Sequence, residues 1–377
     1  MNRLYSLVCL VVLAVFMVNC KKDDGGGSTP YVPPREAKEV YTENLKDIEH
    51  YLDNNYMIED GENISFDSIT SGKYKQQPVL RKDSRLKSIE MSNDDYILMA
   101  FSDSNNPYGP SKYKYLKSAD TIKYKIYYLL INEGKGENVS SIDSIYLKRT
   151  TTTLKNKTFN NLGNPLYGGY YSFPITIPEY TNSVKAPLRT NTGDRQLITK
   201  FLKTALNPGE SSNGEPTYDK DSAGRIIAFI PSGLGKFNYP DGGLEAYKVY
   251  ITDITLISKK ERDHDRDGIP SKYEVKQVVE KGGKVTDAEL KAMNLGIHDY
   301  FAYDTDGDGI PNFLDIDDDG DGVSTKDELS YKIDGEIKYY QYYDEKLKTC
   351  SGVPRYLDAK CFPDRKDGEW VWPTASK

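Results

Sequence analysis

The sequence predicts an α+β fold, because helical and strand-like patterns occupy separate stretches of the chain. One amphipathic helical pattern spans residues 36–54, and short segments rich in Tyr, Ile and Val follow between residues 64 and 147. The third feature is an Asp- and Gly-rich region that begins at residue 263 and has the composition of loops. We therefore expect a helix, a β region and a loop region in that order.

Composition restricts the class of protein further. The chain has 377 residues, 37% of them hydrophobic, and a net charge of −7. This content permits folded domains with real cores, and the length suits two or three of them. The acidic residues concentrate between Asp263 and Glu328, and no basic block accompanies the aromatic residues, so we expect no nucleic-acid partner.

Residues 1–19 have the pattern of a targeting segment. Arg3 gives a positive start, and an apolar stretch from Leu7 to Val18 leads to Cys20. This stretch is shorter than the roughly 20 apolar residues that a transmembrane helix needs. It resembles a bacterial lipoprotein signal, which implies that Cys20 is lipidated, becomes the mature N-terminus and anchors the protein to a membrane. Ordinary secretory cleavage and a membrane-spanning anchor are the alternatives.

Residues 20–35 are expected to form a flexible tether, because residues 21–28 are charged or Gly-rich and contain nothing apolar that could pack. The sequence Lys22-Asp23-Asp24 resembles the export signal that sends lipoproteins of Bacteroidota to the outer face of the outer membrane. The resemblance implies a lipid-anchored outer-membrane protein that faces the extracellular side. A solvated linker without such a signal is the alternative.

Residues 36–130 are expected to contain one helix and several strands. The apolar positions of the helix recur at steps of four, three and four, as expected for a helix with one apolar face. These positions are Tyr41, Leu45, Ile48 and Leu52. Residues 96–101 and 122–128 are rich in aromatic and β-branched side chains and are flanked by Gly, Asn and Pro, which is typical of strands and turns.

Residues 131–258 contain motifs that are ordered as in the FKBP family of peptidyl-prolyl isomerases. A Gly-punctuated turn at residues 133–136 is followed by a strand that leads to Phe159-Asn160. Residues 197–201 stand where the family has a short helix, and residues 227–255 match its Ile-Pro-Ser loop and last strand. The segment resembles a divergent FKBP domain, which implies an antiparallel sheet wrapped on a short helix.

The same resemblance implies a substrate pocket, and its positions match the family unevenly. Aromatic or apolar side chains are kept at Phe159, Ile198, Phe201 and Tyr247. Asn160 replaces the family's aspartate, and Arg149 and Lys236 stand where the family has tyrosines. Two cations that face an apolar groove carry a desolvation cost that a proline peptide does not offset.

Isomerase activity would need no nucleophile at this pocket. Rotation about an X-Pro amide faces a barrier of about 18–20 kcal/mol. A dry aromatic pocket lowers it by favouring the twisted amide. The substitutions leave two hypotheses, an isomerase or binding domain for proline-containing peptides, and a non-catalytic module that adheres to an extracellular protein.

Residues 259–330 contain three acidic loops with the spacing of an EF-hand. Carboxylates stand at positions 1, 3, 5 and 12 of each loop, and glycine stands at position 6. The loops are residues 263–274, 304–315 and 317–328. Because calcium takes six to eight oxygen ligands and this spacing supplies them, we expect calcium as a cofactor.

The expected calcium ligands are the side chains at positions 1, 3, 5, 9 and 12 and the backbone carbonyl at position 7. In the first loop they are Asp263, Asp265, Asp267, Ile269, Ser271 and Glu274. In the second they are Asp304, Asp306, Asp308, Ile310, Asn312 and Asp315. In the third they are Asp317, Asp319, Asp321, Val323, Thr325 and Glu328.

A merely solvated acidic face is the alternative to these calcium sites. The proline that follows position 7 and the adjacency of the second and third loops resemble thrombospondin type 3 repeats, which implies a structural role rather than a sensor. A fourth copy, residues 347–358, lacks acids in its first half, so we expect no metal there.

Residues 331–377 form a Tyr-rich tail. Cys350 and Cys361 are the two cysteines outside the targeting segment, and an exported location favours a disulfide between them. The three histidines are scattered, and no Gly-x-Ser-x-Gly motif or phosphate-binding glycine loop is present, so hydrolase and nucleotide-enzyme functions lack support. A surface folding factor and a calcium-stiffened binding module are the competing classes.

Overall fold

The computed structural model describes residues 34–71, 73, 77–93, 97–101, 112–116, 121–162, 171–172, 192–210, 216–238, 240–366 and 369–372. Cys20 and the expected signal segment lie outside the described residues, as does most of the expected tether. The chain divides into residues 1–35 and a compact unit of residues 36–377. Within the described part of the chain, no helix has the length and apolar character needed to cross a membrane.

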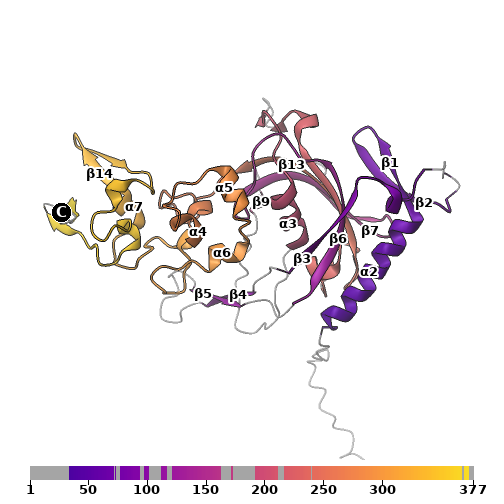
Figure 1. Ribbon diagram of the computed structural model, residues 1–377, viewed down its shortest axis with the longest axis horizontal. Coiled ribbons are helices and arrows are strands. Elements are labelled where there is room, and N and C mark those ends of the chain that lie inside the picture. Colours follow the sequence, from indigo (N-terminus) through magenta and orange to yellow (C-terminus); the bar gives the residue numbers. More distant parts are fainter. Residues whose placement is uncertain are drawn as a thin grey trace, which may run out of the picture. The chain divides into compact units, whose positions relative to one another are not determined.

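Helix α2 (Ala37–Asn54) follows the expected tether and packs against a large antiparallel sheet (Figure 1). Its buried side chains share one face of the helix: Val40, Asn44, Ile48, Tyr51 and Leu52. The expected helix with one apolar face is therefore confirmed.

Seven strands form the main sheet, and every described pair in it is antiparallel. The order along the sheet is β3-β6-β12-β13-β7-β8, and β9 pairs with β7. The strands are β3 (Leu86–Ser92), β6 (Lys123–Asn132), β7 (Ser144–Thr153), β8 (Thr158–Leu162), β9 (Tyr171–Ser172), β12 (Gly224–Ile230) and β13 (Tyr250–Lys260).

Both faces of the sheet are covered at β12, which explains why this strand is almost continuously apolar. Successive side chains of a strand point to opposite faces. Ile226 and Ala228 belong to the core on the side of helix α3 (Thr192–Phe201), whereas Ile227 and Phe229 belong to the core under helix α2. The α+β class, with an antiparallel sheet on a short helix, is therefore confirmed (Figure 1).

The sheet includes strands that the sequence analysis assigned to the region before it. β6 runs through the expected boundary between residues 130 and 131, and β3 pairs with β6 along its length. Strand β3 and the whole of β6 therefore belong to the same sheet as the FKBP-like motifs, whereas β4 and β5 pair separately with each other. The boundary was misplaced because the motifs that carry the resemblance begin only after β6, at Glu133.

The last strand of the sheet begins later than the sequence pattern indicates. β13 starts at Tyr250, and Tyr247 lies before it with a φ of 64°. The Tyr247 ring packs edge-on against Phe237, with 5.1 Å between the ring centroids. A positive φ is unusual for tyrosine, so the alternating pattern here spans a turn and only then a strand.

Smaller hairpins and single 3₁₀ turns complete this part of the chain. The hairpins are β1 (Asn55–Asp60) with β2 (Asn63–Ser68), β4 (Ile97–Phe101) with β5 (Lys112–Leu116), and β10 (Gly209–Glu210) with β11 (Pro216–Thr217). The 3₁₀ turns are η1 (Leu80–Lys82), η2 (Lys220–Ser222) and η3 (Ser232–Leu234).

After β13 the chain forms short helices, turns and two small hairpins. The helices are α4 (Lys276–Val279), α5 (Asp287–Ala292), α6 (Ile297–Phe301) and α7 (Thr325–Leu329). The 3₁₀ turns are η4 (Ser271–Tyr273), η5 (Asn312–Leu314), η6 (Glu345–Leu347) and η7 (Arg355–Leu357). The hairpins are β14 (Ser330–Ile333) with β15 (Glu336–Tyr339), and β16 (Asp364–Lys366) with β17 (Glu369–Val371).

Two small apolar cores hold this region together. The buried members of the first are Ile142, Val275, Val278, Ile297, Tyr300, Phe301 and Phe313. The buried members of the second are Ile269, Leu329, Tyr342, Leu347 and Tyr356. Ile142 precedes β7 of the main sheet, and the Ser141 hydroxyl donates to the Leu295 carbonyl at 3.2 Å, so the loop region packs directly on the sheet region.

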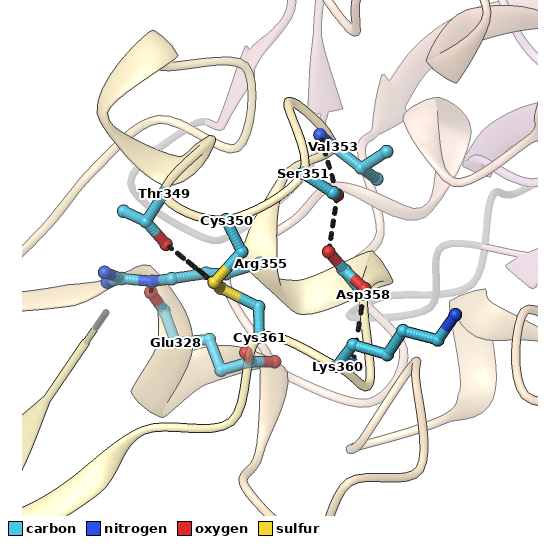
Figure 2. Close-up of a disulfide and its surroundings, with 9 residues drawn as sticks. All are labelled: Glu328, Thr349, Cys350, Ser351, Val353, Arg355, Asp358, Lys360 and Cys361. Atoms are coloured by element: carbon cyan, nitrogen blue, oxygen red, sulfur yellow. Dashed lines mark hydrogen bonds between the residues drawn. A yellow bond between two sulfur atoms is a disulfide. The ribbon is translucent and has the colours of Figure 1, made fainter. Parts of the chain in front are cut away.

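A disulfide between Cys350 and Cys361 closes a small loop in the tail, which is the pairing expected from the sequence (Figure 2). The two cysteines are 11 residues apart, so the bond constrains the unfolded chain only modestly. Arg355 lies next to the disulfide and donates to the carbonyl oxygen of Glu328 (Figure 2). The tail is thereby connected to the last residue of the third acidic loop.

Candidate functional site

The three acidic loops are closed by the same backbone hydrogen bond. In the first loop the N–H of Ser271, at position 9, donates to the carbonyl of Arg262, the residue before position 1, at 2.8 Å. The equivalent bonds are Asn312 to Tyr303 at 2.9 Å and Thr325 to Ile316 at 2.8 Å. This repetition shows that the sequence repeat is also a structural repeat.

Inside each loop the aspartates accept hydrogen bonds from the loop backbone. The carboxylates at position 1 accept from the glycine N–H at position 6, over 3.2 Å for Asp263, 3.0 Å for Asp304 and 2.8 Å for Asp317. The carboxylates at position 5 accept from position 7 at 2.7 Å in every loop. At Asp263, Asp267 and Asp321 the second oxygen has no hydrogen-bond partner among the described residues. Asp304 and Asp317 accept backbone hydrogen bonds through both oxygens.

Glycine at position 6 is required by the backbone conformation. Gly268, Gly309 and Gly322 have φ values of 106°, 95° and 92°. Side chains on L-residues strongly disfavour this region, whereas glycine adopts it without a steric cost. Position 6 therefore contributes to the loop shape and not to the ligand set.

The side chains at position 9 hold the loop closed, although the sequence analysis expected them as ligands. Ser271 Oγ accepts from the His264 N–H at 3.1 Å, and Asn312 Oδ1 accepts from the Thr305 N–H at 2.9 Å. Thr325 Oγ1 likewise accepts from the N–H at position 2 of the third loop, at 3.1 Å. Each bond joins position 9 to position 2, so these oxygens have a structural partner within the loop.

The carboxylate oxygens form four compact groups, in each of which the oxygens lie within 4.8 Å of one another. Three groups consist of positions 1, 3 and 5 of one loop: Asp263, Asp265 and Asp267; Asp304, Asp306 and Asp308; Asp317, Asp319 and Asp321. The fourth consists of Asp267, Glu274 and Asp318. Two oxygens that share one calcium at 2.3–2.6 Å can be at most about 5 Å apart, so each group could hold a single ion.

Several of these carboxylates are buried without a partner. Glu274 is 3% exposed and Glu328 0% exposed, and neither oxygen of either carboxylate has a hydrogen-bond partner among the described residues. Burial, reinforced by Asp319, raises the pKa of Glu328 to about 10. Burial and the adjacent Asp267 raise the pKa of Asp265 to about 9. Such groups are costly to bury as anions unless a cation compensates them.

Asp315, the position-12 residue of the second loop, is less enclosed than its counterparts. Its Oδ1 accepts from the Asp317 N–H at 3.0 Å, which links the second loop to the third. Burial, together with Asp308 and Asp306, raises the pKa of Asp315 to about 7. Its carboxylate therefore interacts electrostatically with acids of the second loop.

The donor set fits calcium better than a transition metal. The compact groups contain only carboxylates, and calcium prefers hard oxygen ligands in flexible geometry. The Nδ1 atom of the His264 imidazole lies 2.8 Å from Ser271 Oγ. Burial lowers the pKa of His264 to about 4. This histidine is thus a neutral partner of the loop closure.

The position-7 residues expected to offer a carbonyl have buried side chains, and Ile269 belongs to the second apolar core. Ile269 is 2% exposed, Ile310 is 4% exposed and Val323 is 1% exposed. The burial fixes the backbone of each loop at position 7, so the conformation of the acidic loops and the burial of these side chains depend on each other.

The fourth copy of the repeat keeps the loop shape but has different side chains. Leu347 is buried at position 1, and the Ser351 hydroxyl donates to the Asp358 carboxylate across the loop (Figure 2). Gly352 at position 6 has a φ of 85°. The acids at positions 1 and 5 of the other three loops are replaced here by a buried leucine and a serine that makes an internal hydrogen bond.

Sequence reasoning missed Asp318 as a member of the carboxylate clusters. It stands at position 2 of the third loop, which contributes no ligand to a single EF-hand loop. In the structure it lies with Asp267 and Glu274 of the first loop. The signal that could have revealed it is the run of consecutive aspartates at residues 317–319, because adjacent side chains point to different sides.

The residues expected to form a prolyl pocket gather only in part. Phe159, Asn160 and Lys236 line a shallow cavity of about 10 Å³. The other lining residues are Arg149, Thr151, Asp194, Asp241 and Tyr250. As bounded by the described residues, this cavity has room for about one water molecule, which is too little for a proline ring.

Three other expected pocket residues lie elsewhere. Ile198 is 1% exposed within the sheet core, and Phe201 stacks on Tyr128 with 4.8 Å between the ring centroids. Tyr250, rather than Tyr247, packs edge-on against Phe159 at 6.1 Å. The aromatic position of the last strand was therefore misassigned by three residues, because β13 begins at Tyr250.

A buried ion pair occupies the cavity lining. Arg149 lies 3.3 Å from the Asp194 carboxylate, which is 3% exposed and also near the Tyr250 hydroxyl, at 3.5 Å. Burial raises the pKa of Asp194, and Arg149 opposes that shift. Lys236 pairs with Asp241 at 3.2 Å. The expected cations are thus neutralised by acids that the sequence analysis did not assign.

Residues 264–353 match the family model described as BamM C-terminal. Among solved structures the chain is similar to FkpA from Escherichia coli, with 18% identity, a TM-score of 0.24 and coverage of 36% of this chain and 48% of that one. A peptidyl-prolyl cis-trans isomerase from Pseudomonas syringae pv. tomato has 12% identity, a TM-score of 0.25 and coverage of 36% and 76%. The N-terminal domain of FKBP42 from Arabidopsis thaliana has 12% identity and a TM-score of 0.25, and the match covers 39% of this chain and 96% of that one. The chain spans about half the length of FkpA, and no curated protein matches it significantly.

Proposed function

We propose that this chain is a lipid-anchored protein of the outer membrane whose acidic loops bind calcium and stiffen a non-catalytic, FKBP-like binding module on the cell surface. The observation that carries the proposal is the burial of Glu274 and Glu328 with all four carboxylate oxygens unpartnered. A calcium ion in each loop would compensate these charges, which no described basic side chain does at Glu274. An extracellular setting suits such sites, because calcium is available there at millimolar concentration, where weak structural sites are saturated.

Calcium uptake measured by isothermal titration calorimetry tests this proposal on the detergent-solubilised mature protein. We expect binding of three ions, one for each acidic loop. Glu274→Gln should weaken the binding of one of these ions, because position 12 of the first loop closes the ligand shell of that ion. Glu336→Gln is the matched control, since this exposed residue on β15 lies outside the acidic loops and pairs with the exposed Lys338. Absence of calcium uptake at millimolar concentration would remove the proposal.

The lipid anchor rests on the resemblance of residues 1–20 to a lipoprotein signal. Cys20→Ala is expected to release the protein from membranes, because the proposed lipid anchor would be attached at Cys20. Cys9→Ala is the matched control and should leave it membrane-bound, since Cys9 lies within the signal segment. Fractionation of cells into membrane and soluble protein measures both; Cys20→Ala protein that stayed with the membrane would contradict the anchor.

The outer-face orientation has a separate test. Replacing Asp23 and Asp24 by alanine should leave the protein lipidated but facing the periplasm, because the export signal would be lost while Cys20 is kept. External protease added to intact cells measures the orientation. Unchanged accessibility would argue against the export signal while leaving the lipid anchor intact.

A second function, prolyl isomerisation, is favoured by Phe159, which keeps the aromatic wall of an FKBP pocket beside Tyr250. We expect the activity to be slow or absent, because the described cavity measures about 10 Å³ and the Arg149–Asp194 pair lines it. Lys236→Tyr should raise the rate if the rest of the pocket is intact, whereas the exposed Lys220→Tyr should not. An X-Pro peptide assay measures both, and a wild-type rate typical of the family would refute the non-catalytic assignment.

A further inference from the structure

The first and third acidic loops meet at one cluster of buried carboxylates. Oxygens of Asp267 and Glu274 in the first loop and of Asp318 in the third lie within 4.8 Å of one another. The three residues are 1%, 3% and 2% exposed. Three acids this close and this buried would repel one another strongly without a cation between them.

The unpartnered atoms point to a ligand at this cluster. Asp267 Oδ2, Asp318 Oδ1 and both carboxylate oxygens of Glu274 are buried and have no hydrogen-bond partner among the described residues. The separation of at most 4.8 Å matches oxygens on opposite sides of one calcium ion. The cluster is therefore a built site rather than a patch of surface acids.

The backbone of the third loop aims Asp318 away from its own loop. The Asp318 N–H donates to Thr325 Oγ1 at 3.1 Å, which holds this residue in the closure of the third loop. Its neighbours Asp317 and Asp319 belong to the carboxylate group of the third loop. The middle aspartate of the three consequently faces the first loop while the outer two face their own.

We infer that Asp318 is a ligand of the calcium ion bound by the first loop, so that the third loop completes the first site. This inference rests on the proposed calcium binding and adds to it a specific ligand that crosses between loops. A complete first site then requires a folded third loop. Calcium binding at the two loops must be thermodynamically coupled, with each ion favouring the other.

Asp318→Asn tests the inference through two effects of opposite sign. With calcium present, the variant should bind the first-loop ion at least about tenfold more weakly, because one charged ligand is lost. With chelator present, the same variant should melt at a higher temperature than wild type, because the repulsion with Asp267 and Glu274 is relieved. A purely structural role for Asp318 would lower the melting temperature under both conditions.

A double-mutant cycle assigns Asp318 to a site. Combined with Glu274→Gln, Asp318→Asn should affect the same ion, so the two effects on calcium affinity should be clearly non-additive. When Asp318→Asn is combined with Glu328→Gln, the two substitutions should weaken the binding of two different calcium ions. Asp334→Asn is the matched control, because Asp334 is exposed in the β14–β15 turn at a φ of 52°, which asparagine tolerates.

The outcomes separate the two proposals. Wild-type protein that takes up no calcium would remove the proposed function and the inference with it. Wild-type protein that binds three ions, together with Asp318→Asn protein that binds them with unchanged affinity, would overturn the inference alone. Lower melting temperatures of Asp318→Asn in both calcium and chelator would also overturn it.

Discussion

Chelation of calcium is expected to loosen the region of residues 263–328 and to lower its melting temperature, while the main sheet responds much less. The three loops place carboxylates at positions 1, 3, 5 and 12, and these acids repel one another in a compact state without cations. An ion that binds only the folded loop stabilises it by about 2.7 kcal/mol for each site at a hundredfold excess over Kd. Loss of three such sites would remove a large part of the marginal stability that a folded region has.

Hydrogen exchange with and without chelator measures this effect at each segment. Residues 304–328 should lose their protection in chelator, because Ile310 and Val323 are buried only while their loops are folded. Amides of β12 should keep their protection, since this strand is covered on both faces by apolar side chains. Equal exchange of residues 304–328 under both conditions would show that the acids are only a solvated surface.

The effect should also reach a short way into the sheet region. Ile142 belongs to the same core as Val275 and Phe313, and Ser141 donates to the Leu295 carbonyl. Residues 140–143 should therefore exchange faster when calcium is removed, although β7 beyond them stays protected. A calcium titration should restore the protection of both segments over the same concentration range.

The loops could be predicted from sequence because their determinants are local. Positions 1, 3, 5 and 6 act through backbone bonds within one loop, and the glycine φ of 106° at Gly268 follows from the EF-hand spacing. The helix at residues 37–54 was likewise predictable, because the spacing of its apolar residues along the sequence matches the helical period and so defines one apolar face.

The remaining features depend on contacts between distant segments, which no local pattern reveals. Asp318 meets Glu274 because two loops pack together, and Asp194 meets Arg149 because α3 packs against β7. The position of β13 was misjudged for a different reason. Tyr247 has a positive φ, which a pattern of alternating side chains does not record.

Removal of Arg149 is expected to destabilise the sheet domain strongly. Asp194 is 3% exposed and would lose its ionic partner, and an uncompensated buried charge costs about 3–5 kcal/mol. Urea unfolding in saturating calcium measures the change for Arg149→Ala. Lys220→Ala is the matched control, because the pair of Lys220 with Glu62 is exposed and should contribute little.

A double variant separates the ion pair from simple loss of packing. Arg149→Met combined with Asp194→Leu removes both charges and keeps most of the volume. It should recover most of the stability that Arg149→Ala loses, since replacing a buried pair by apolar side chains is often neutral or favourable. If the double variant were as unstable as Arg149→Ala, the loss would come from packing and not from the unpaired charge.

The pH dependence of Arg149→Ala provides the last check, and its sign follows from Asp194. Burial raises the pKa of Asp194 in the folded state, and without Arg149 nothing nearby opposes that shift as strongly. Between the ordinary aspartate pKa of about 3.9 and the raised folded value, the folded state binds more protons than the unfolded state. Stability therefore falls as the pH rises through this window, and the deficit of Arg149→Ala relative to wild type should shrink as the pH is lowered toward about 4. A deficit that stayed constant with pH would mean that Asp194 is not the group left uncompensated.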